Sequence, residues 1–197
     1  MGIFITIDGP NGVGKSTFIE FLSSMISKKY KVYITKEPTN TEFGIKLRKN
    51  EENQQGLEYA KLIAEDRKVH VKEEIESAKN KNDIILCDRY IDSSLVFQVY
   101  DGLSMDEVWA LNSQITIPDI SIILLAKPEL LEERLNARKY LTHYEKTMTR
   151  TEEVERYKEA SDFLIKKGFN VIIYENNFME DQKSNIKNAL SSIINLL

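Results

Sequence analysis

The amino-acid sequence predicts an α/β protein in which helices flank a parallel five-stranded sheet on both faces. Short β-branched, apolar runs alternate along the chain with longer segments of helical periodicity, which is typical of parallel sheets. The first of these runs leads into a glycine-rich loop and then into a helix. The length of 197 residues fits one domain, and no repeat or linker divides the chain.

The candidate strands are apolar and mostly not alternating, so we expect them to be buried on both faces. They are Ile3–Asp8, Lys31–Lys36, Asp83–Asp88, Asp119–Leu125 and Asn170–Tyr174. The candidate helices carry apolar residues at helical spacing. They are Lys15–Lys29, Leu57–Asn80, Ser104–Gln114, Glu129–Lys139, Glu152–Lys167 and Met179–Asn195. The polar stretch Lys139–Arg150 lies between two of these helices without strong periodicity, and we expect a mobile lid there.

Composition and charge exclude several classes of function. The chain is 42% hydrophobic and 29% charged, which is ordinary for a globular protein. Its net charge of −4 gives no bulk attraction to nucleic acid or to an anionic membrane. Cys87, His70 and His143 are too few for a disulfide or a zinc site, and no segment is apolar and long enough to cross a bilayer. We expect a cytoplasmic protein without nucleic-acid or membrane partners.

The strongest motif is the loop Gly9–Ser16, whose sequence GPNGVGKS has the spacing of a P-loop between a strand and a helix. Glycines let successive backbone N–H groups point inward, and the helix N-terminus adds partial positive charge, so the main chain cradles a triphosphate. Lys15 is expected to reach the β and γ phosphates, and the Ser16 hydroxyl to ligate Mg²⁺. The expected ATP site comprises Gly9, Pro10, Asn11, Gly12, Val13, Gly14, Lys15, Ser16 and Thr17.

Charged residues follow two of the candidate strands. Asp88 ends the run IILCD, where it is placed to hold Mg²⁺ through water, although it also suits the cap of the following turn. Arg89 comes next, and its guanidinium matches phosphate oxygens, with a structural ion pair as the alternative. Asp8 ends the first strand beside the P-loop. Because open parallel sheets bind ligands at their carboxyl ends, we assign catalytic roles to Lys15, Arg89, Asp8 and Asp88.

A P-loop alone does not choose between GTPases, ATPases and small-molecule kinases. Asn80–Asp83 reads NKND, like the guanine-reading motif, but it follows a helix instead of a strand, and we interpret it as a turn. Another nucleotide or nucleoside kinase, or a regulatory ATPase without a small acceptor, therefore remains possible from the residues alone.

Five segments follow one another in an order that is typical of one enzyme family. They are GPNGVGKST from Gly9, TKEP from Thr35, GIKLR from Gly44, LIAEDRKVH from Leu62 and DRYIDSSLVFQ from Asp88. On these segments the chain resembles the thymidylate kinase family, well over residues 1–125 and only in layout beyond them. The resemblance implies a three-layer P-loop fold, a homodimer, and transfer of the γ-phosphoryl group of ATP to dTMP.

The resemblance also implies where the acceptor phosphate and sugar bind. Arg89 and Arg48 correspond to residues that hold the acceptor phosphate and nucleotide. Glu37 and Pro38 correspond to an acidic turn near the acceptor sugar. In this turn the usual arginine and glycines are replaced by Lys36, Thr39 and Asn40.

For the acceptor base, Gln98 and Arg67 resemble the residues that read the pyrimidine edge, and Ser94 lines the same pocket. Phe97 lies where the family places an aromatic ring against the deoxyribose, and Ile63 replaces the phenylalanine that stacks on thymine. Solvated positions for Gln98 and Arg67, and a core position for Phe97, are the alternatives.

The lid differs from the family pattern. Where the family has Asp-Arg-Leu-Glu, this chain has Thr142, His143, Tyr144 and Glu145, so the usual phosphate-binding arginine is missing. Arg138 or Arg150 is expected to supply that charge to ATP.

Overall fold

The computed structural model describes residues 1–197 and shows one five-stranded sheet. The strands are β1 (Ile3–Asp8), β2 (Val32–Lys36), β3 (Ile84–Asp88), β4 (Ile120–Leu125) and β5 (Val171–Glu175). Their order is β2-β3-β1-β4-β5, and every neighbouring pair is parallel. The predicted α/β class and parallel sheet are confirmed, with strand boundaries that differ by one residue at four of the five strands.

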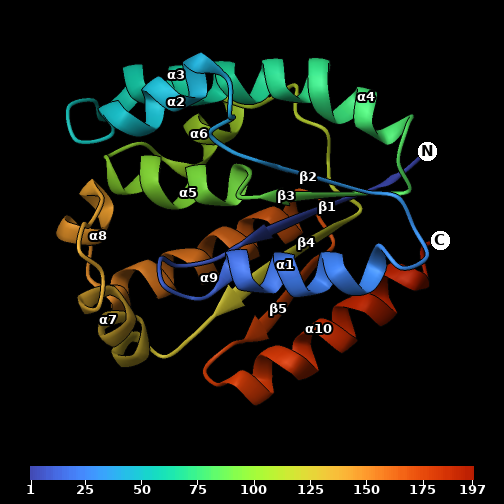
Figure 1. Cartoon of the computed structure of the whole chain (residues 1–197). Coiled ribbons are helices and arrows are strands. Elements are labelled where there is room, and N and C mark those ends of the chain that lie inside the picture. Colours follow the sequence, from blue (N-terminus) through green and yellow to red (C-terminus); the bar gives the residue numbers. More distant parts are fainter.

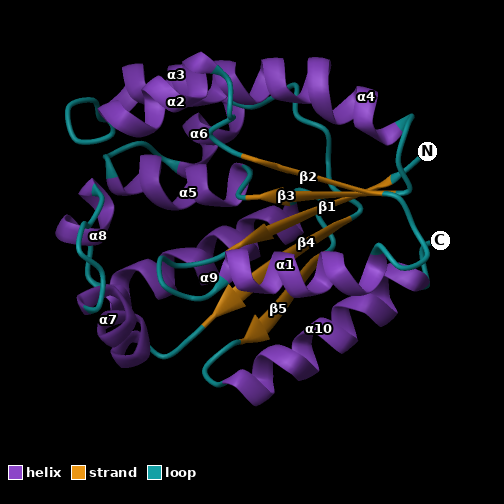
Figure 2. Ribbon diagram, in the orientation of Figure 1, coloured by secondary structure: helices purple, strands orange, loops and turns teal.

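Helices cover both faces of the sheet, which gives three layers (Figures 1 and 2). The helices are α1 (Lys15–Ile26), α2 (Glu42–Asn50), α3 (Gly56–Val69), a π-helical segment η1 (His70–Ile75), α4 (Glu76–Lys79), α5 (Ile91–Tyr100), α6 (Met105–Leu111), α7 (Pro128–Asn136), α8 (His143–Thr147), α9 (Arg150–Lys166) and α10 (Met179–Ile194). None of them combines the length and apolar composition that crossing a bilayer requires.

The hydrophobic core has two parts, one on each face of the sheet. Alternate residues of β1 point to opposite faces, so Phe4 joins one part while Ile5 joins the other. The first part packs the sheet against α5 and α9, and the second packs it against α1 and α10. The two packed faces fix the carboxyl ends of β1 and β3, from which the P-loop and Arg89 emerge.

Several expected elements differ from the structure. The edge strands β2 and β5 are only partly buried, because each lacks a neighbouring strand on one side. Helices α2 and α5 are absent from the sequence-based prediction, and the predicted helix Leu57–Asn80 is interrupted by η1. The NKND segment lies in a turn before β3, as predicted. The segment 139–150 contains α8 and several buried side chains, and its mobility stays a prediction.

Candidate active site

The P-loop connects β1 to α1 in a conformation that requires glycine. Gly9 has φ 142°, and a Cβ there would lie 2.1 Å from the Leu124 carbonyl oxygen, so the loop packs directly against β4. Gly14 has φ 99° and is the N-cap of α1. The N-terminus of a twelve-residue helix therefore opens onto the loop, which is the arrangement that binds phosphate groups through backbone N–H donors.

Lys15 is folded back into this loop. Its Nζ donates to the carbonyl oxygens of Gly9 at 2.7 Å and Pro10 at 3.0 Å, and the side chain is buried. Burial and the charge of Arg89 lower the pKa of Lys15 from 10.5 to about 8. The ammonium is therefore charged at neutral pH and loses its proton in a mildly alkaline solution.

This lowered pKa predicts a pH dependence of ATP binding. As the pH rises through about 8, the free protein loses the Lys15 proton, so the affinity for ATP should fall by at most about tenfold per pH unit. Titration calorimetry between pH 6.5 and 9.5 measures the effect. In Lys15→Arg the guanidinium stays charged, and the pH dependence should disappear. An affinity in the unmodified protein that is constant across this range would contradict the prediction.

Arg89 follows β3 with φ 70°, and it is the one residue other than glycine with a positive φ. Its side chain is 21% exposed and donates to Asn11 Oδ1 at 2.7 Å, Ser93 Oγ at 2.8 Å and the Tyr157 hydroxyl at 3.1 Å. The strained backbone and these contacts aim the guanidinium across the cleft at the P-loop. A salt bridge to the buried Asp8 at 3.5 Å is longer than these bonds and exists beside them, so the ion-pair interpretation describes only part of its role.

The structure gives Asp8 a positioning role. The carboxylate is fully buried and accepts hydrogen bonds from the N–H groups of Gly9, Tyr90 and Ser93, from the Ser93 hydroxyl and from the Tyr157 hydroxyl. These bonds tie β1, the start of α5, and α9 together. Through these bonds, Asp8 fixes the conformation of the P-loop and of the segments that contact it. Its predicted direct catalytic role has no support in this geometry.

Asp88 differs from Asp8 because its Oδ1 is buried and has no hydrogen-bond partner. The capping interpretation therefore fails for this atom. A carboxylate oxygen is the ligand type that Mg²⁺ prefers, and Ser16 at the start of α1 has an exposed side chain. The residues present fit a magnesium ion between the P-loop and β3.

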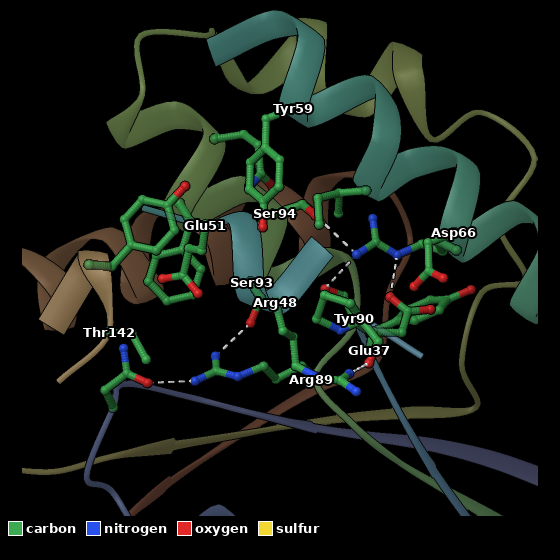
Figure 3. A pocket seen from close by; sticks show the side chains of 17 residues that line it. Glu37, Arg48, Glu51, Tyr59, Asp66, Arg89, Tyr90, Ser93, Ser94 and Thr142 are labelled. Carbon is green, nitrogen blue, oxygen red and sulfur yellow. Dashed lines mark hydrogen bonds and ion pairs between the residues drawn. The ribbon is translucent and has the colours of Figure 1, made fainter. Parts of the chain in front are cut away.

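A cavity of about 220 Å³ lies beside Arg89, and Figure 3 shows the side chains around it. It is lined by most of the predicted acceptor residues: Glu37, Pro38, Arg48, Ile63, Arg67, Arg89, Ser94, Phe97 and Gln98. Gln98 is buried, and its Oε1 has no partner in the protein. Solvated positions for Gln98 and Arg67 are thus excluded, and the structure brings these residues together as one pocket.

Arg67 is held at each of its nitrogens. Nε donates to Glu37 Oε2 at 2.6 Å, Nη1 to Asn112 at 2.6 Å, and Nη2 to the Tyr90 carbonyl and to Ser94 Oγ, both at 3.0 Å. The side chain is 2% exposed. Burial lowers the pKa of Arg67, but the charge and hydrogen bond of Glu37 and the nearby Tyr90 and Cys87 together raise it, so the guanidinium stays charged.

The acidic turn keeps a defined shape without the family's glycines. Asp66 accepts hydrogen bonds at 2.7 Å from both the backbone N–H and the hydroxyl of Thr39. Arg48 donates to the Pro38 carbonyl and, at 3.4 Å, to Asn40 Oδ1. Side-chain contacts therefore fix the turn beside the pocket, and Arg48 reaches it from α2.

The two candidate lid arginines differ sharply. Arg150 is 4% exposed, pairs with Glu153, and donates to the carbonyls of Tyr144, Glu145 and Met148. It holds α8 onto α9, so its predicted contact with ATP is not supported. Arg138 has a side chain that is 47% exposed and bonds only Glu145, at 2.5 Å. It is the arginine of the pair that is accessible to a nucleotide.

Two tyrosines belong to the site although the sequence-based prediction does not include them. Tyr157 on α9 contacts both Asp8 and Arg89, and Tyr144 on α8 stacks on Phe97 with ring centroids 4.6 Å apart. Their positions depend on packing between distant segments. One local signal exists, because Thr142 and Glu145 form a capping box, a pattern that predicts the start of α8.

Comparison with known proteins agrees with this geometry. The family model described as thymidylate kinase matches residues 7–186. A thymidylate kinase of Staphylococcus haemolyticus is 37% identical over 142 residues, covering 68% of this chain and 70% of the relative. One of Caldicellulosiruptor saccharolyticus is 38% identical over 143 residues (68% and 69%). A probable thymidylate kinase of Archaeoglobus fulgidus is 27% identical over 196 residues (98% and 97%). The chain belongs to the thymidylate kinase family.

Proposed function

We propose that the protein transfers the γ-phosphoryl group of ATP to dTMP and releases dTDP and ADP. The observation that carries the proposal is the buried side-chain oxygen of Gln98, which has no partner in the protein and lies in a pocket that Arg89 and Asn11 connect to the P-loop. A buried polar oxygen without a partner costs free energy unless a ligand satisfies it. The imide edge of thymine offers the matching donor and acceptors, with Arg67 as a further donor.

The acceptor phosphate is assigned to Arg89 and Arg48, which both line the pocket. Its second pKa is about 6, so the attacking oxygen is already mostly deprotonated at neutral pH and needs no general base. The main obstacle is to bring two anions into line while water is excluded. The protein therefore acts mainly by positioning and by fixed positive charge.

On the donor side, backbone N–H groups of the P-loop and Lys15 hold the triphosphate. Asp88, through water, and Ser16 are the proposed holders of Mg²⁺, which when bound neutralises charge on the β and γ phosphates. Lys15 must exchange its bonds to the Gly9 and Pro10 carbonyls for phosphate oxygens. Arg138 is the proposed lid arginine, and it must leave Glu145 to reach the transferring group.

The pocket walls provide a basis for selecting a deoxynucleotide. Phe97 stacks on Tyr144, and the central carbon of the Arg89 guanidinium lies 5.5 Å from the Phe97 ring centroid. A ring that two fixed side chains contact cannot easily move away from a 2′-hydroxyl. Ile63 supplies an apolar contact to the base in place of aromatic stacking.

A coupled assay with ATP tests the proposal across dTMP, dUMP, UMP, CMP and thymidine. We expect turnover to be fastest with dTMP and to fall with the ribonucleotides. If another monophosphate is preferred, the protein is a different kinase of the same fold. Slow ATP hydrolysis that no nucleotide accelerates would instead identify a regulatory ATPase and would contradict the proposal.

We propose further that residues 1–197 form one kinase domain with residues 139–150 as its lid, that it acts in the cytoplasm, and that it forms a homodimer. Support for the dimer comes from large apolar side chains on neighbouring α2 and α3: Phe43 is 40% exposed and Val69 is 39% exposed, and both line one surface hollow. Burying such side chains against a second copy would remove them from water.

The dimer proposal predicts the effect of one substitution. Phe43→Asp places a charge in the proposed interface and should convert the dimer into a monomer in sedimentation analysis at micromolar concentration. Phe21→Asp is the matched control, because Phe21 is 49% exposed on α1, away from this surface. A monomer in the unmodified protein, or a dimer that survives Phe43→Asp, would contradict the proposal.

A further inference from the structure

His70 is a buried residue that the proposed reaction does not use. It is 2% exposed and begins η1, at the point where the α-helical hydrogen bonding of α3 changes to π-helical. Such changes inside a helix frequently occur at functional sites. The ring lies three residues after Arg67, under the same acidic turn that lines the acceptor pocket.

The hydrogen bonds around His70 fit a ring that donates from both nitrogens. Nδ1 lies 2.9 Å from Glu37 Oε1, and Nε2 lies 2.8 Å from Thr35 Oγ1. The Thr35 hydroxyl has a single proton, which it donates to Glu74 Oε1. Its oxygen is then an acceptor for Nε2, so all four groups are satisfied together only when the imidazole is an imidazolium.

The charges around the ring favour that protonated form. Burial lowers the pKa of His70, but the hydrogen bond and charge of Glu37 and the charges of Glu74 and Asp66 together raise it above 6.5. Glu37 follows β2, Asp66 belongs to α3 and Glu74 to η1. The cation Arg67 opposes these carboxylates from α3, and Tyr33 on β2 donates to Glu74 at 3.1 Å.

Glu37 links this cluster to the acceptor site. One carboxylate oxygen faces His70, and the other accepts from Arg67 Nε at 2.6 Å. Both side chains of the Arg67–Glu37 ion pair are at most 4% exposed, so the carboxylate has no solvent to stabilise it. Bonds to two cations fix the orientation of the Glu37 carboxylate, and this carboxylate in turn fixes the orientation of the Arg67 guanidinium.

We propose that His70 is a positioning residue for the acceptor base: as an imidazolium it fixes Glu37, and Glu37 fixes the guanidinium of Arg67 beside Gln98. The inference rests on the proposed dTMP kinase activity. His70 does not line the acceptor pocket. Losing its charge should therefore weaken dTMP binding while leaving ATP binding and the phosphoryl-transfer machinery intact.

Kinetics of three variants test this role. In His70→Gln the side chain keeps one donor but has no charge, and we expect the KM for dTMP to rise about tenfold with an unchanged KM for ATP. Glu74→Gln removes a charge that favours the imidazolium, so the KM for dTMP should begin to rise at a lower pH than in the unmodified protein. Lys72→Gln changes the charge at an exposed position on the same segment η1, outside the hollow that Phe43 and Val69 line; it is the control and should behave like the unmodified protein.

The protonation state is measured directly by NMR of protein labelled with ¹⁵N-histidine. The chain has two histidines, and His143→Gln assigns the two sets of ring signals. We expect both ring nitrogens of His70 to give imidazolium shifts at pH 7 and to lose them at a lower pH in Glu74→Gln. Calorimetry with dTMP alone measures acceptor binding over the pH range of the NMR titration. Because ATP is absent, the titration of Lys15 does not affect the comparison between the variants.

The outcomes separate the inference from the function on which it rests. If the unmodified protein phosphorylates no nucleoside monophosphate, the proposed function fails. If it phosphorylates dTMP, but His70 is neutral at pH 7 or His70→Gln leaves the KM for dTMP unchanged, only the role of His70 is overturned. If His70→Gln does not fold, the NMR titration of the unmodified protein and the kinetics of Glu74→Gln test the role of His70.

Discussion

Replacing Arg89 with alanine should lower kcat with ATP and dTMP by about 100- to 1,000-fold. Removing one preorganised donor to developing charge typically costs on the order of 2.7–4 kcal/mol of barrier. Arg89 fits this description, because its backbone is held at φ 70° and its guanidinium is bonded to three side chains, those of Asn11 in the P-loop, Ser93 and Tyr157. Steady-state kinetics at saturating substrates measure the effect.

Two controls make the Arg89 result interpretable. Arg156→Ala removes an arginine of α9 that pairs with Glu152 on the surface, and it should leave kcat unchanged. Thermal unfolding of Arg89→Ala reports whether the buried Asp8 cluster survives the loss of its cationic partner. Near-normal turnover at saturating dTMP in Arg89→Ala would contradict the assigned role.

Replacing Lys15 with methionine should abolish most of the activity, because it removes a charge that binds the donor ATP. We expect kcat to fall by about as much as in Arg89→Ala, and ATP to bind more weakly. The methionine keeps much of the length of the side chain but has no charge for the β and γ phosphates. Because the ammonium is buried at a cost that lowers its pKa to about 8, its removal should lower activity much more than stability.

Kinetics and thermal unfolding of Lys15→Met check this pair of expectations. Lys61→Met is the matched control, since Lys61 pairs with Glu58 on the exposed side of α3. Binding of dTMP alone should be unchanged in Lys15→Met, because Lys15 does not line the acceptor pocket. ATP affinity and turnover equal to those of the unmodified protein would refute the role of Lys15.

Local sequence patterns predict the sheet and the P-loop because both depend on short-range chemistry. The β-branched runs and the glycine spacing each need only neighbouring residues. Local sequence patterns do not predict helix α5. Residues Ile91–Gln98 are all buried, so the segment has no exposed polar face, and its apolar residues show no helical period. The spacing of apolar residues does not predict the change to a π-helix at His70 either.

The acceptor residues follow from the family resemblance, and the structure adds what holds them. Whether an arginine faces solvent or a buried carboxylate depends on partners that are distant in the chain. Arg150 forms an ion pair with Glu153 and donates hydrogen bonds to backbone carbonyls of the lid, whereas Arg138 is accessible. The stack of Tyr144 on Phe97 joins segments 47 residues apart, and no local pattern encodes it.

The central claim is that one cleft holds a triphosphate on the P-loop and a thymidine monophosphate in the pocket beside Arg89. The most direct test is titration calorimetry, in the presence of Mg²⁺, with adenosine and thymidine joined through their 5′ positions by five phosphate groups. If both subsites face each other, this compound should bind at least about a hundredfold more tightly than ATP or dTMP alone. An affinity no greater than that of ATP would contradict the claim.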